Sequence, residues 1–535
     1  MNAVESLRAY IDSILPNVEG PKILVLDDET TKIIGLIYSK TELLQHDVVL
    51  IDTISKVINK NVDEALTTIQ CVCILRPTHE VIRDLSNELN TPHYGSYYLF
   101  FTNVLNQAFV TQLAFADHSS KVSVVHEIFL DTYALTSRLF SLGIPYCLNS
   151  LKNNIEDPKF QTIVDRLFSM LGALKLKCTI RYDGKSSICR RASERLISLM
   201  EKRQEYFYSS DSALLLILDR RTDAITPLLH QWGYVELLHD ALTIDNNVIM
   251  ADGKQLVIDE RTDKFFAKYM FSSFPDVNNE LMNMSKEIKS SPKPSNIKDF
   301  DDLKSFIQTY PDAKDRQETY AKHVSLLSAA NSSLTSDSVI SRTGNIELDM
   351  AVDNNSKALQ QIFDEMDKGS FNSVNRLCVI YALKFEHLKE NINQLRQRLS
   401  SYPRGDEILH NMDNITQMAG EKYSNRDLSV VGQIFSKFGG LIGQMTNEDS
   451  GLMRYRCPLE QIIKCCRDGS LSTEEFPFCR DSSNRRFAKV IVFFVGGATY
   501  TEAKVAYAAS GRGFDVIVGG TNVHNFNSFL KECEY

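Results

Sequence analysis

The sequence lacks the patterns on which most enzymes and metal sites depend. It contains no G-x-x-x-x-G-K-[ST] phosphate loop, no G-x-G-x-x-G turn after a strand, no G-x-S-x-G nucleophile elbow and no H-E-x-x-H zinc motif. The 11 cysteines form no C-x-x-C pair, and the closest ones, Cys71/Cys73 and Cys465/Cys466, have no histidine at ligand spacing. The sequence therefore predicts no catalytic residue, no metal and no cofactor.

Positive charge and long apolar runs are also scarce. The formal net charge is −9, which does not suit a nucleic-acid-binding surface, because such a surface needs lysine and arginine to displace counterions. The longest apolar run, residues 490–495, is too short to cross a bilayer. The N-terminus lacks the basic region and apolar core of a signal peptide. We therefore expect a cytoplasmic protein with reduced cysteines, no nucleic-acid partner and no direct membrane insertion.

What remains is an ordinary globular composition in a long chain. Hydrophobic residues make up 43% and charged residues 24% of the sequence, which is typical of folded soluble proteins. Only 14 prolines and 24 glycines occur, so long linkers are scarce. A length of 535 residues favours three or four domains.

Short apolar runs alternate with helical patterns through the first third of the chain. The runs predict strands at residues 22–26, 48–51, 71–75 and 97–101. Thr78 predicts the N-cap of a helix that extends to Leu89. Such alternation is typical of a parallel, doubly wound sheet. We predict one α/β domain over residues 1–145 and the start of a second over 146–245, with a buried strand at 213–218.

The middle of the chain has a different character. Helical periodicity dominates residues 246–480, which predict a mainly helical third domain. Two polar stretches interrupt it, at 290–295 and 331–345, and both predict exposed loops.

The end of the chain returns to an α/β pattern. Residues 481–535 contain two predicted strands, at 489–495 and 515–518, and Thr499-x-x-Glu502 predicts a capping box. An isolated strand pair needs a sheet to join, and the nearest candidate contains residues 214–218. We therefore expect 481–535 to be the second part of a discontinuous second domain.

Three features leave alternatives open. The Gly-Gly turns at 496–497 and 519–520 could admit an anion at a helix N-terminus or could serve tight packing, which we favour. Asp219, Arg220 and Asp223 follow a buried strand, where α/β enzymes place catalytic groups, but a corner that locks strand to helix is favoured. The single tryptophan, Trp232, is an interface anchor or, more simply, a core residue.

Long motifs resemble one known family. Residues 214–229, LLLILDRRTDAITPLL, followed by Trp232-Gly233-Tyr234, resemble the signature LLILDRxxDPxTPLLxxWTY of the SM (Sec/Munc-like) family of SNARE-binding regulators. Residues 490–503 and 518–530 are similar to the closing pattern of that family. Motifs such as Leu75-Arg76-Pro77-Thr78 resemble its vacuolar protein sorting branch, which serves endosomal and trans-Golgi syntaxins. Gly233 stands where the family has threonine, and Phe115 interrupts a commonly acidic stretch.

The resemblance implies an arch of three domains: two doubly wound parallel-sheet domains and a mainly helical third domain. It also implies three binding elements. An N-terminal syntaxin peptide would dock on the first domain within residues 109–133, in a groove lined by Leu113, Val122, Val125, Phe129 and Tyr133. Charged cleft contacts would fall at Asp27, Lys32 and Asp52. A helical hairpin at about residues 285–345 would hold SNARE helices in register.

The function implied by the resemblance is regulation of SNARE-mediated vesicle fusion in endosomal, trans-Golgi and vacuolar traffic, with no catalysis. The partners would be a syntaxin-family SNARE of the endosome or trans-Golgi and an assembled or half-assembled SNARE bundle. Membrane association would be peripheral and through these partners. The alternatives are an SM protein of another compartment, a tethering-complex subunit of the same fold, or a nucleotide-binding α/β enzyme.

Overall fold

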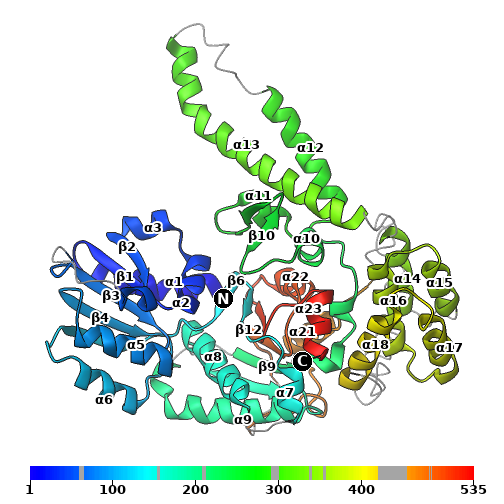
Figure 1. Ribbon diagram of the computed structural model, residues 1–535, viewed down its shortest axis with the longest axis horizontal. Coiled ribbons are helices and arrows are strands. Elements are labelled where there is room, and N and C mark those ends of the chain that lie inside the picture. Colours follow the sequence, from blue (N-terminus) through cyan, green and yellow to red (C-terminus); the bar gives the residue numbers. More distant parts are fainter. Residues whose placement is uncertain are drawn as a thin grey trace. The chain divides into compact units, whose positions relative to one another are not determined.

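The computed structural model describes residues 1–59, 66–153, 157–207, 213–290, 300–335, 340–352, 357–419, 455–480, 482 and 485–534. The chain divides into two compact units. Unit one comprises Met1–Arg220, Leu459–Ala498 and Val505–Val523, and unit two comprises Arg221–Pro458, Thr499–Lys504 and His524–Tyr535. Figure 1 labels the elements of both.

Unit one contains a five-stranded parallel sheet in the order β2-β1-β3-β4-β5 (Figure 1). The interior strand β1 is buried at every position, and the edge strands β2 and β5 are partly exposed. Ile23, Leu85 and Leu113 belong to one apolar cluster that packs α5 (His79–Asn90) and α6 (Gln107–Ala116) against the sheet. The predicted parallel α/β arrangement is confirmed. The strands are β1 (Lys22–Leu26), β2 (Val48–Thr53), β3 (Gln70–Leu75), β4 (Ser96–Phe101) and β5 (Val122–Glu127).

The second sheet of unit one joins strands from distant parts of the chain. Its order is β6-β7-β13-β12-β9-β8, and β12 pairs in parallel with β9, as expected for the C-terminal strands. β6 and β7 fall within the predicted first domain, residues 1–145, but they pair in this second sheet. The strands are β6 (Tyr133–Thr136), β7 (Leu139–Ser141), β8 (Cys178–Tyr182), β9 (Ala213–Asp219), β12 (Lys489–Val495) and β13 (Asp515–Gly520).

Polar side chains fix where many helices of unit one begin. The predicted N-cap Thr78 accepts the backbone N–H of Val81 at 3.4 Å, and Asn2, Asp27, Ser39, Asn106, Asp157 and Ser186 cap their helices in the same way. The helices are α1 (Ala3–Ile14), α2 (Asp28–Ile37), α3 (Lys40–Gln45), α4 (Ile54–Val57), α5 (His79–Asn90), α6 (Gln107–Ala116), α7 (Leu148–Asn153), α8 (Pro158–Leu174) and α9 (Ser187–Lys202). Two more, α21 (Pro458–Asp468) and α22 (Tyr500–Ala509), cross the residue boundaries between the units.

Unit two is mainly helical, as predicted for the middle of the chain. Its helix α16 is buried from Ser373 to Leu383. The helices are α10 (Tyr234–Leu242), α11 (Lys264–Tyr269), α12 (Phe274–Ser290), α13 (Phe300–Thr335), α14 (Ile340–Val352), α15 (Ala358–Met366), α16 (Phe371–Lys384), α17 (Lys389–Leu399), α18 (Gly405–Ala419) and α23 (Phe526–Glu534). The strands β10 (Val248–Ala251) and β11 (Lys254–Val257) form an antiparallel pair.

The predicted helical hairpin is present with different bounds. α12 and α13 lie side by side (Figure 1), so the hairpin begins at Phe274 and not near residue 285. The loop predicted over 331–345 is wrong for residues 331–335, which continue α13, and for 340–345, which belong to α14, while residues 336–339 lie outside the described residues. The hydroxyl of Ser332 donates to the carbonyl of Ser328 at 2.9 Å, which lets a polar residue remain inside a helix. Apart from Ser290 at the end of α12, the loop predicted over 290–295 lies outside the described residues.

The two Gly-Gly turns of unit one are packing sites. A Cβ atom at Gly496 would lie 2.7 Å from the Leu148 side chain, and one at Gly519 would lie 2.1 Å from the Phe140 ring. Gly496 also has φ +94, a conformation that other residues rarely adopt. Protein side chains therefore occupy the space beside these turns, in agreement with the packing alternative.

We predict that Gly519→Ala destabilises the protein by about 1–3 kcal/mol, because the new methyl group overpacks the core against Phe140. The matched control is Gly35→Ala in α2, where a Cβ meets nothing within 4 Å. Since alanine has the higher helix propensity, this control should be neutral or slightly stabilising. Thermal unfolding followed by circular dichroism measures both. Equal midpoints for the two variants would contradict the packing role.

Candidate functional site

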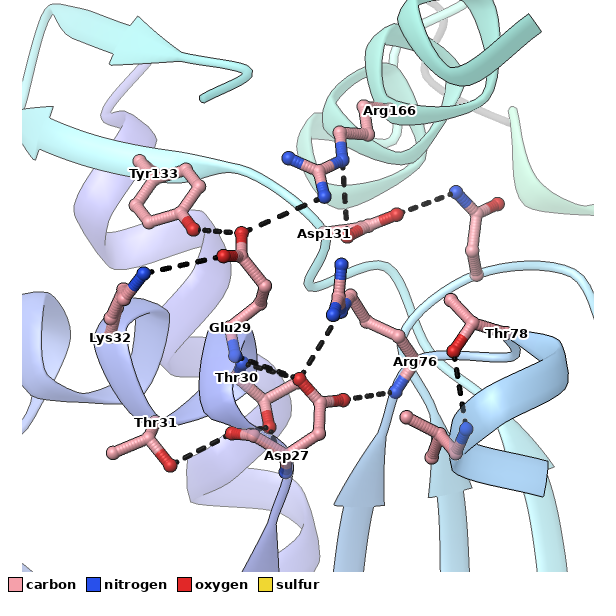
Figure 2. Close-up of polar contacts among 12 residues, drawn as sticks. Asp27, Glu29, Thr30, Thr31, Lys32, Arg76, Thr78, Asp131, Tyr133 and Arg166 are labelled. Carbon is pink, nitrogen blue, oxygen red and sulfur yellow. Dashed lines mark hydrogen bonds and ion pairs between the residues drawn. The ribbon is translucent and has the colours of Figure 1, made fainter. Parts of the chain in front are cut away.

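The strand order of the first sheet changes direction between β1 and β3. In open α/β sheets, ligands bind outside the carboxyl ends of the strands at such a point. Asp27 follows β1 directly and Arg76 follows β3 directly. Figure 2 shows both side chains at this edge, together with residues from α2, α8 and the segment that leads into β6.

Both carboxylate oxygens of Asp27 form hydrogen bonds within the protein. Its Oδ1 accepts the backbone N–H groups of Glu29 at 2.9 Å and Thr30 at 3.0 Å, which caps α2. Its Oδ2 accepts the backbone N–H of Arg76 at 2.7 Å, and the Arg76 Nε lies 3.2 Å from Oδ1. The family resemblance implies a charged cleft contact at Asp27, but this residue is only 4% exposed, because its carboxylate both caps a helix N-terminus and forms a buried ion pair. It is a structural lock between β1 and β3.

A second layer of charge surrounds Glu29. The Tyr133 hydroxyl donates to Glu29, and Arg166 of α8 lies 3.7 Å from both Glu29 and Asp131 (Figure 2). Burial alone would raise the pKa of Glu29, but the Tyr133 hydrogen bond and the charges of Arg76 and Arg166 hold it below its usual value. Tyr133, predicted in the peptide groove, is 3% exposed and belongs to this network instead.

Asp131 is the carboxylic acid of this network whose pKa is raised by burial. Burial raises the pKa of its carboxyl group to about 6, although Arg166 and the amide of Asn103, 3.3 Å away, favour the charged form. The folded protein therefore binds a proton at Asp131 more readily than the unfolded chain between about pH 4 and pH 6.

The other two predicted cleft residues differ in exposure. The Lys32 side chain is 54% exposed and lies 3.4 Å from Glu29. Asp52, at the end of β2, is half-buried, and its carboxylate accepts the backbone N–H of Thr53 at 2.9 Å. Of the three predicted contacts, Lys32 is thus the one with a largely exposed charge. An exposed pair of this kind contributes about 0–1 kcal/mol to stability.

The residues predicted to line the peptide groove separate into interior and surface positions. Leu113 is 5% exposed and Phe129 is 1% exposed, so both are core residues like Tyr133. Val122 is partly buried against the same core, whereas Val125 on β5 is 46% exposed.

The predicted groove residues did not include two exposed apolar side chains of α6. Val110 and Phe115 on α6 are 37% and 74% exposed. The buried residues of α6 are Phe109, Leu113 and Ala116, so a period of 3.6 residues already directs Val110 and Phe115 outward. We name the three exposed residues Val110, Phe115 and Val125 the α6–β5 apolar surface, in which Val110 and Phe115 lie on opposite flanks of the buried face of α6.

Hydrogen bonds and ring contacts hold the segment that starts at the end of β9 and carries the family signature, including Asp219, Arg220, Asp223 and Trp232. In unit one, Asp219 accepts the Ser186 hydroxyl at 2.6 Å, and the guanidinium of the buried Arg220 lies 4.3 Å from the centre of the Phe494 ring. In unit two, Asp223 accepts the hydroxyl and the N–H of Thr226 at 2.6 and 3.1 Å, and Trp232 is half-buried. These contacts agree with the packing alternative for the corner.

One group of potential metal ligands occurs among the described residues. The donor atoms of Asp223, Cys457 and Glu502 lie within 4.8 Å of one another. Asp223 already accepts hydrogen bonds from Thr226, and Glu502 accepts the N–H of Thr499 at 2.7 Å in the predicted capping box. We therefore assign no metal to them. In the part of the chain that the structure describes, no helix combines the length and the apolarity needed to span a bilayer.

Comparisons with known proteins cover almost the whole chain. The family profile described as Sec1 family matches residues 22–532. Vacuolar protein sorting-associated protein 45 of Dictyostelium discoideum is 29% identical over 99% of this chain and 96% of its own length. The protein of the same name from Homo sapiens is 30% identical, with coverage of 99% and 96%. A solved structure titled "SM Protein Vps45 in Complex with Qa SNARE Tlg2 (1-310)" is 27% identical, with a TM-score of 0.86 over 100% of this chain and 98% of that one.

We expect Asp27→Ala to destabilise the protein by about 2 kcal/mol or more, because it removes a helix cap and leaves the Arg76 guanidinium without its carboxylate. Lys32→Ala is the matched control on the same helix and should change stability by less than about 0.5 kcal/mol. Urea unfolding of both variants provides the comparison. Similar losses would mean that Asp27 is not the lock between β1 and β3.

Asp131 should make stability fall as pH rises from about 4 to 6, because its folded pKa lies above its unfolded one. Asp131→Asn removes this titration, so the melting temperature of the variant relative to wild type should increase across that window. The free energy of unfolding should change by at most about 3 kcal/mol across the window, because the folded and unfolded pKa values differ by about two. If the melting temperatures of the variant and the wild type differed by the same amount at every pH from 4 to 7, the assignment of this titration to Asp131 would be refuted.

Proposed function

The chain belongs to the Sec1 family, and we propose on that premise that it binds a syntaxin-class SNARE and regulates SNARE-mediated vesicle fusion in endosomal and trans-Golgi traffic. The observation that carries this proposal is the similarity, at 27% identity and over the full chain, to an SM protein solved with a Qa SNARE. The curated relatives named vacuolar protein sorting-associated protein 45 support the same branch of traffic.

The chemistry proposed for this protein is binding, with no bond made or broken. SNARE segments are disordered when free, and ordering them on assembly costs several kcal/mol. A surface that aligns two SNARE helices in advance lowers this cost for the assembled bundle. The α12–α13 hairpin is our candidate for that surface, and a SNARE bundle or half-bundle is its partner.

A second contact would hold the N-terminal peptide of the syntaxin. We place it on the α6–β5 apolar surface, because its three side chains are large, apolar and exposed, whereas Phe109 and Leu113, the other large apolar residues of α6, are buried. Large apolar and aromatic side chains of this kind are common in the contact area of protein–protein interfaces. Lys32 is the candidate for a charged contact elsewhere on unit one, acting on orientation and association rate more than on affinity.

The protein would then work in the cytoplasm and reach endosomal or Golgi membranes through its SNARE partners. A nucleotide-binding enzyme is disfavoured, because Leu148 and Phe140 lie against the two Gly-Gly turns that would have to admit a phosphate. An SM protein of another compartment would share the fold and differ in the set of syntaxins it binds.

Calorimetry with the cytosolic domains of endosomal, Golgi and plasma-membrane syntaxins tests the proposal. We expect the tightest binding to an endosomal or trans-Golgi syntaxin. The double variant Phe115→Arg/Val125→Arg should weaken binding of its N-terminal peptide about tenfold or more, because charge replaces apolar contact at a surface that folding does not use. Leu113→Arg is unsuitable, since Leu113 is a core residue.

Met250→Arg in unit two is the matched control, because Met250 is also an exposed apolar residue, at 55%. It should leave peptide binding unchanged. Unaltered peptide binding by the double variant would remove the α6–β5 apolar surface from the proposal, and absence of binding to every syntaxin would refute the function itself.

A further inference from the structure

A chain of buried polar side chains holds α13 in unit two. The Tyr234 hydroxyl of α10 lies 2.7 Å from the Nδ1 of His323 on α13. The Nε2 of the same ring lies 2.9 Å from the Oδ2 of Asp263, the residue before α11. Tyr234 and His323 are 0% exposed and Asp263 is 6% exposed. We name these three residues the α13 relay.

Every polar atom of the α13 relay has a partner in one arrangement of protons. A neutral imidazole has one donor and one acceptor nitrogen. Since a carboxylate only accepts, Nε2 carries the proton and donates to Asp263, and Nδ1 accepts from the Tyr234 hydroxyl. The second oxygen of Asp263 accepts the backbone N–H of Phe266 at 2.9 Å, which caps α11. The relay therefore connects three helices through directional bonds.

Charged groups around the α13 relay support the same arrangement. Lys322, next to His323, forms an ion pair with Asp263, and its Nζ also donates to the carbonyl of Val257 on β11 at 3.3 Å. Burial lowers the pKa of His323, and Asp263 offsets this only in part. Burial would raise the pKa of Asp263, but the bonds from His323 and Lys322 bring it well below its usual value. A neutral imidazole beside a charged carboxylate is thus the stable state at neutral pH.

The α13 relay lies where α13 passes from an exposed to a buried environment. Residues 314–318 of this helix are exposed, whereas Leu326 and Ala330, one and two turns after His323, are 0% exposed. Apolar contacts alone allow a helix to rotate or shift by small steps, because they have no direction. A buried hydrogen-bonded network allows one register only, because any other leaves polar atoms unpaired.

We propose that Tyr234, His323 and Asp263 are positioning residues that set the register of α13, and so of the α12–α13 hairpin against which SNARE helices align. This inference rests on the function proposed above. The α13 relay would contribute by keeping the hairpin ordered in advance, so that SNARE binding does not have to supply that ordering.

The α13 relay also predicts a pH dependence. His323 has a folded pKa below its unfolded value, so its contribution is fully present above about pH 6.5 and is lost as pH falls below that value. A protonated ring would have Lys322 beside it and would lose the acceptor that the Tyr234 hydroxyl uses. We expect the free energy of unfolding to fall below pH 6.5, and SNARE assembly by the wild-type protein to slow only at the lower pH that protonates the buried ring.

Two conservative variants test the α13 relay. Tyr234→Phe removes one hydroxyl and keeps the ring, and His323→Gln cannot titrate and cannot reach both partners in the same geometry. Ser325→Ala is the matched control, because it removes a 2.8 Å hydrogen bond from α13 to Asp252 and leaves the relay intact. Two quantities are measured. The rate of SNARE bundle assembly is monitored by Förster resonance energy transfer, and the ordering of α12 and α13 by hydrogen exchange of their backbone amides.

We expect Tyr234→Phe and His323→Gln to slow assembly about tenfold at pH 7.5, which corresponds to about 1.4 kcal/mol. Exchange should accelerate in α12 and α13 and not in α16, and binding of the syntaxin N-terminal peptide should be unchanged. His323→Gln should also lose the pH dependence below pH 6.5. If the glutamine variant does not fold, Tyr234→Phe alone decides.

Wild-type exchange and wild-type assembly in both variants would overturn the inference. So would faster exchange with unchanged assembly, since the register of α13 would then not matter for SNARE alignment. Failure of the wild-type protein to accelerate assembly would instead refute the proposed function, while the exchange data would still show whether the α13 relay orders the hairpin.

Discussion

Strand β9 constrains the rest of the chain, because it cannot lie at the edge of a sheet. All seven of its residues, Ala213–Asp219, are buried, and a buried strand needs a hydrogen-bonded neighbour on each side. β8 provides one neighbour locally, and β12 provides the other from beyond residue 488. Closing so long a loop costs little more than closing a short one, since the entropy grows only with the logarithm of length. A helical unit can therefore be inserted between two neighbouring strands without loss of the sheet.

The same need to satisfy buried polar groups explains the switch point of the first sheet. An enzyme of this strand order leaves the carboxyl ends of its central strands open to a ligand. Here Asp27 caps α2 and binds Arg76, and Glu29 binds Tyr133 and lies near Arg166. These groups are used to hold elements together, which suits a protein that presents rigid surfaces to partners.

Sequence patterns predict where the strands lie better than they predict which sheet each strand joins. Apolar runs located β1, β3, β4, β9 and β12, because strands buried on both faces consist of uninterrupted apolar residues. They could not assign β6 and β7 to the second sheet, since short strands have the same pattern in either sheet. The polar stretch at 331–345 predicts a loop, because serine and asparagine favour loops, whereas residues 331–335 continue α13, where the Ser332 hydroxyl donates to the carbonyl of Ser328.

In the candidate site, too, local patterns in the sequence predict the exposure of single residues but not their contacts with distant residues. Helical periodicity separates the buried Leu113 from the exposed Phe115, so the α6 residues of the α6–β5 apolar surface can be predicted from the sequence of that helix. The N-cap preference likewise places Asp27 at the start of α2. The approach of Arg76 to Asp27 depends on the pairing of β1 with β3, and the meeting of Tyr234, His323 and Asp263 depends on the packing of three helices. Polar contacts between residues distant in the chain select one packing arrangement of this protein. A buried polar atom finds hydrogen-bond partners in few arrangements, whereas an apolar atom packs well in many.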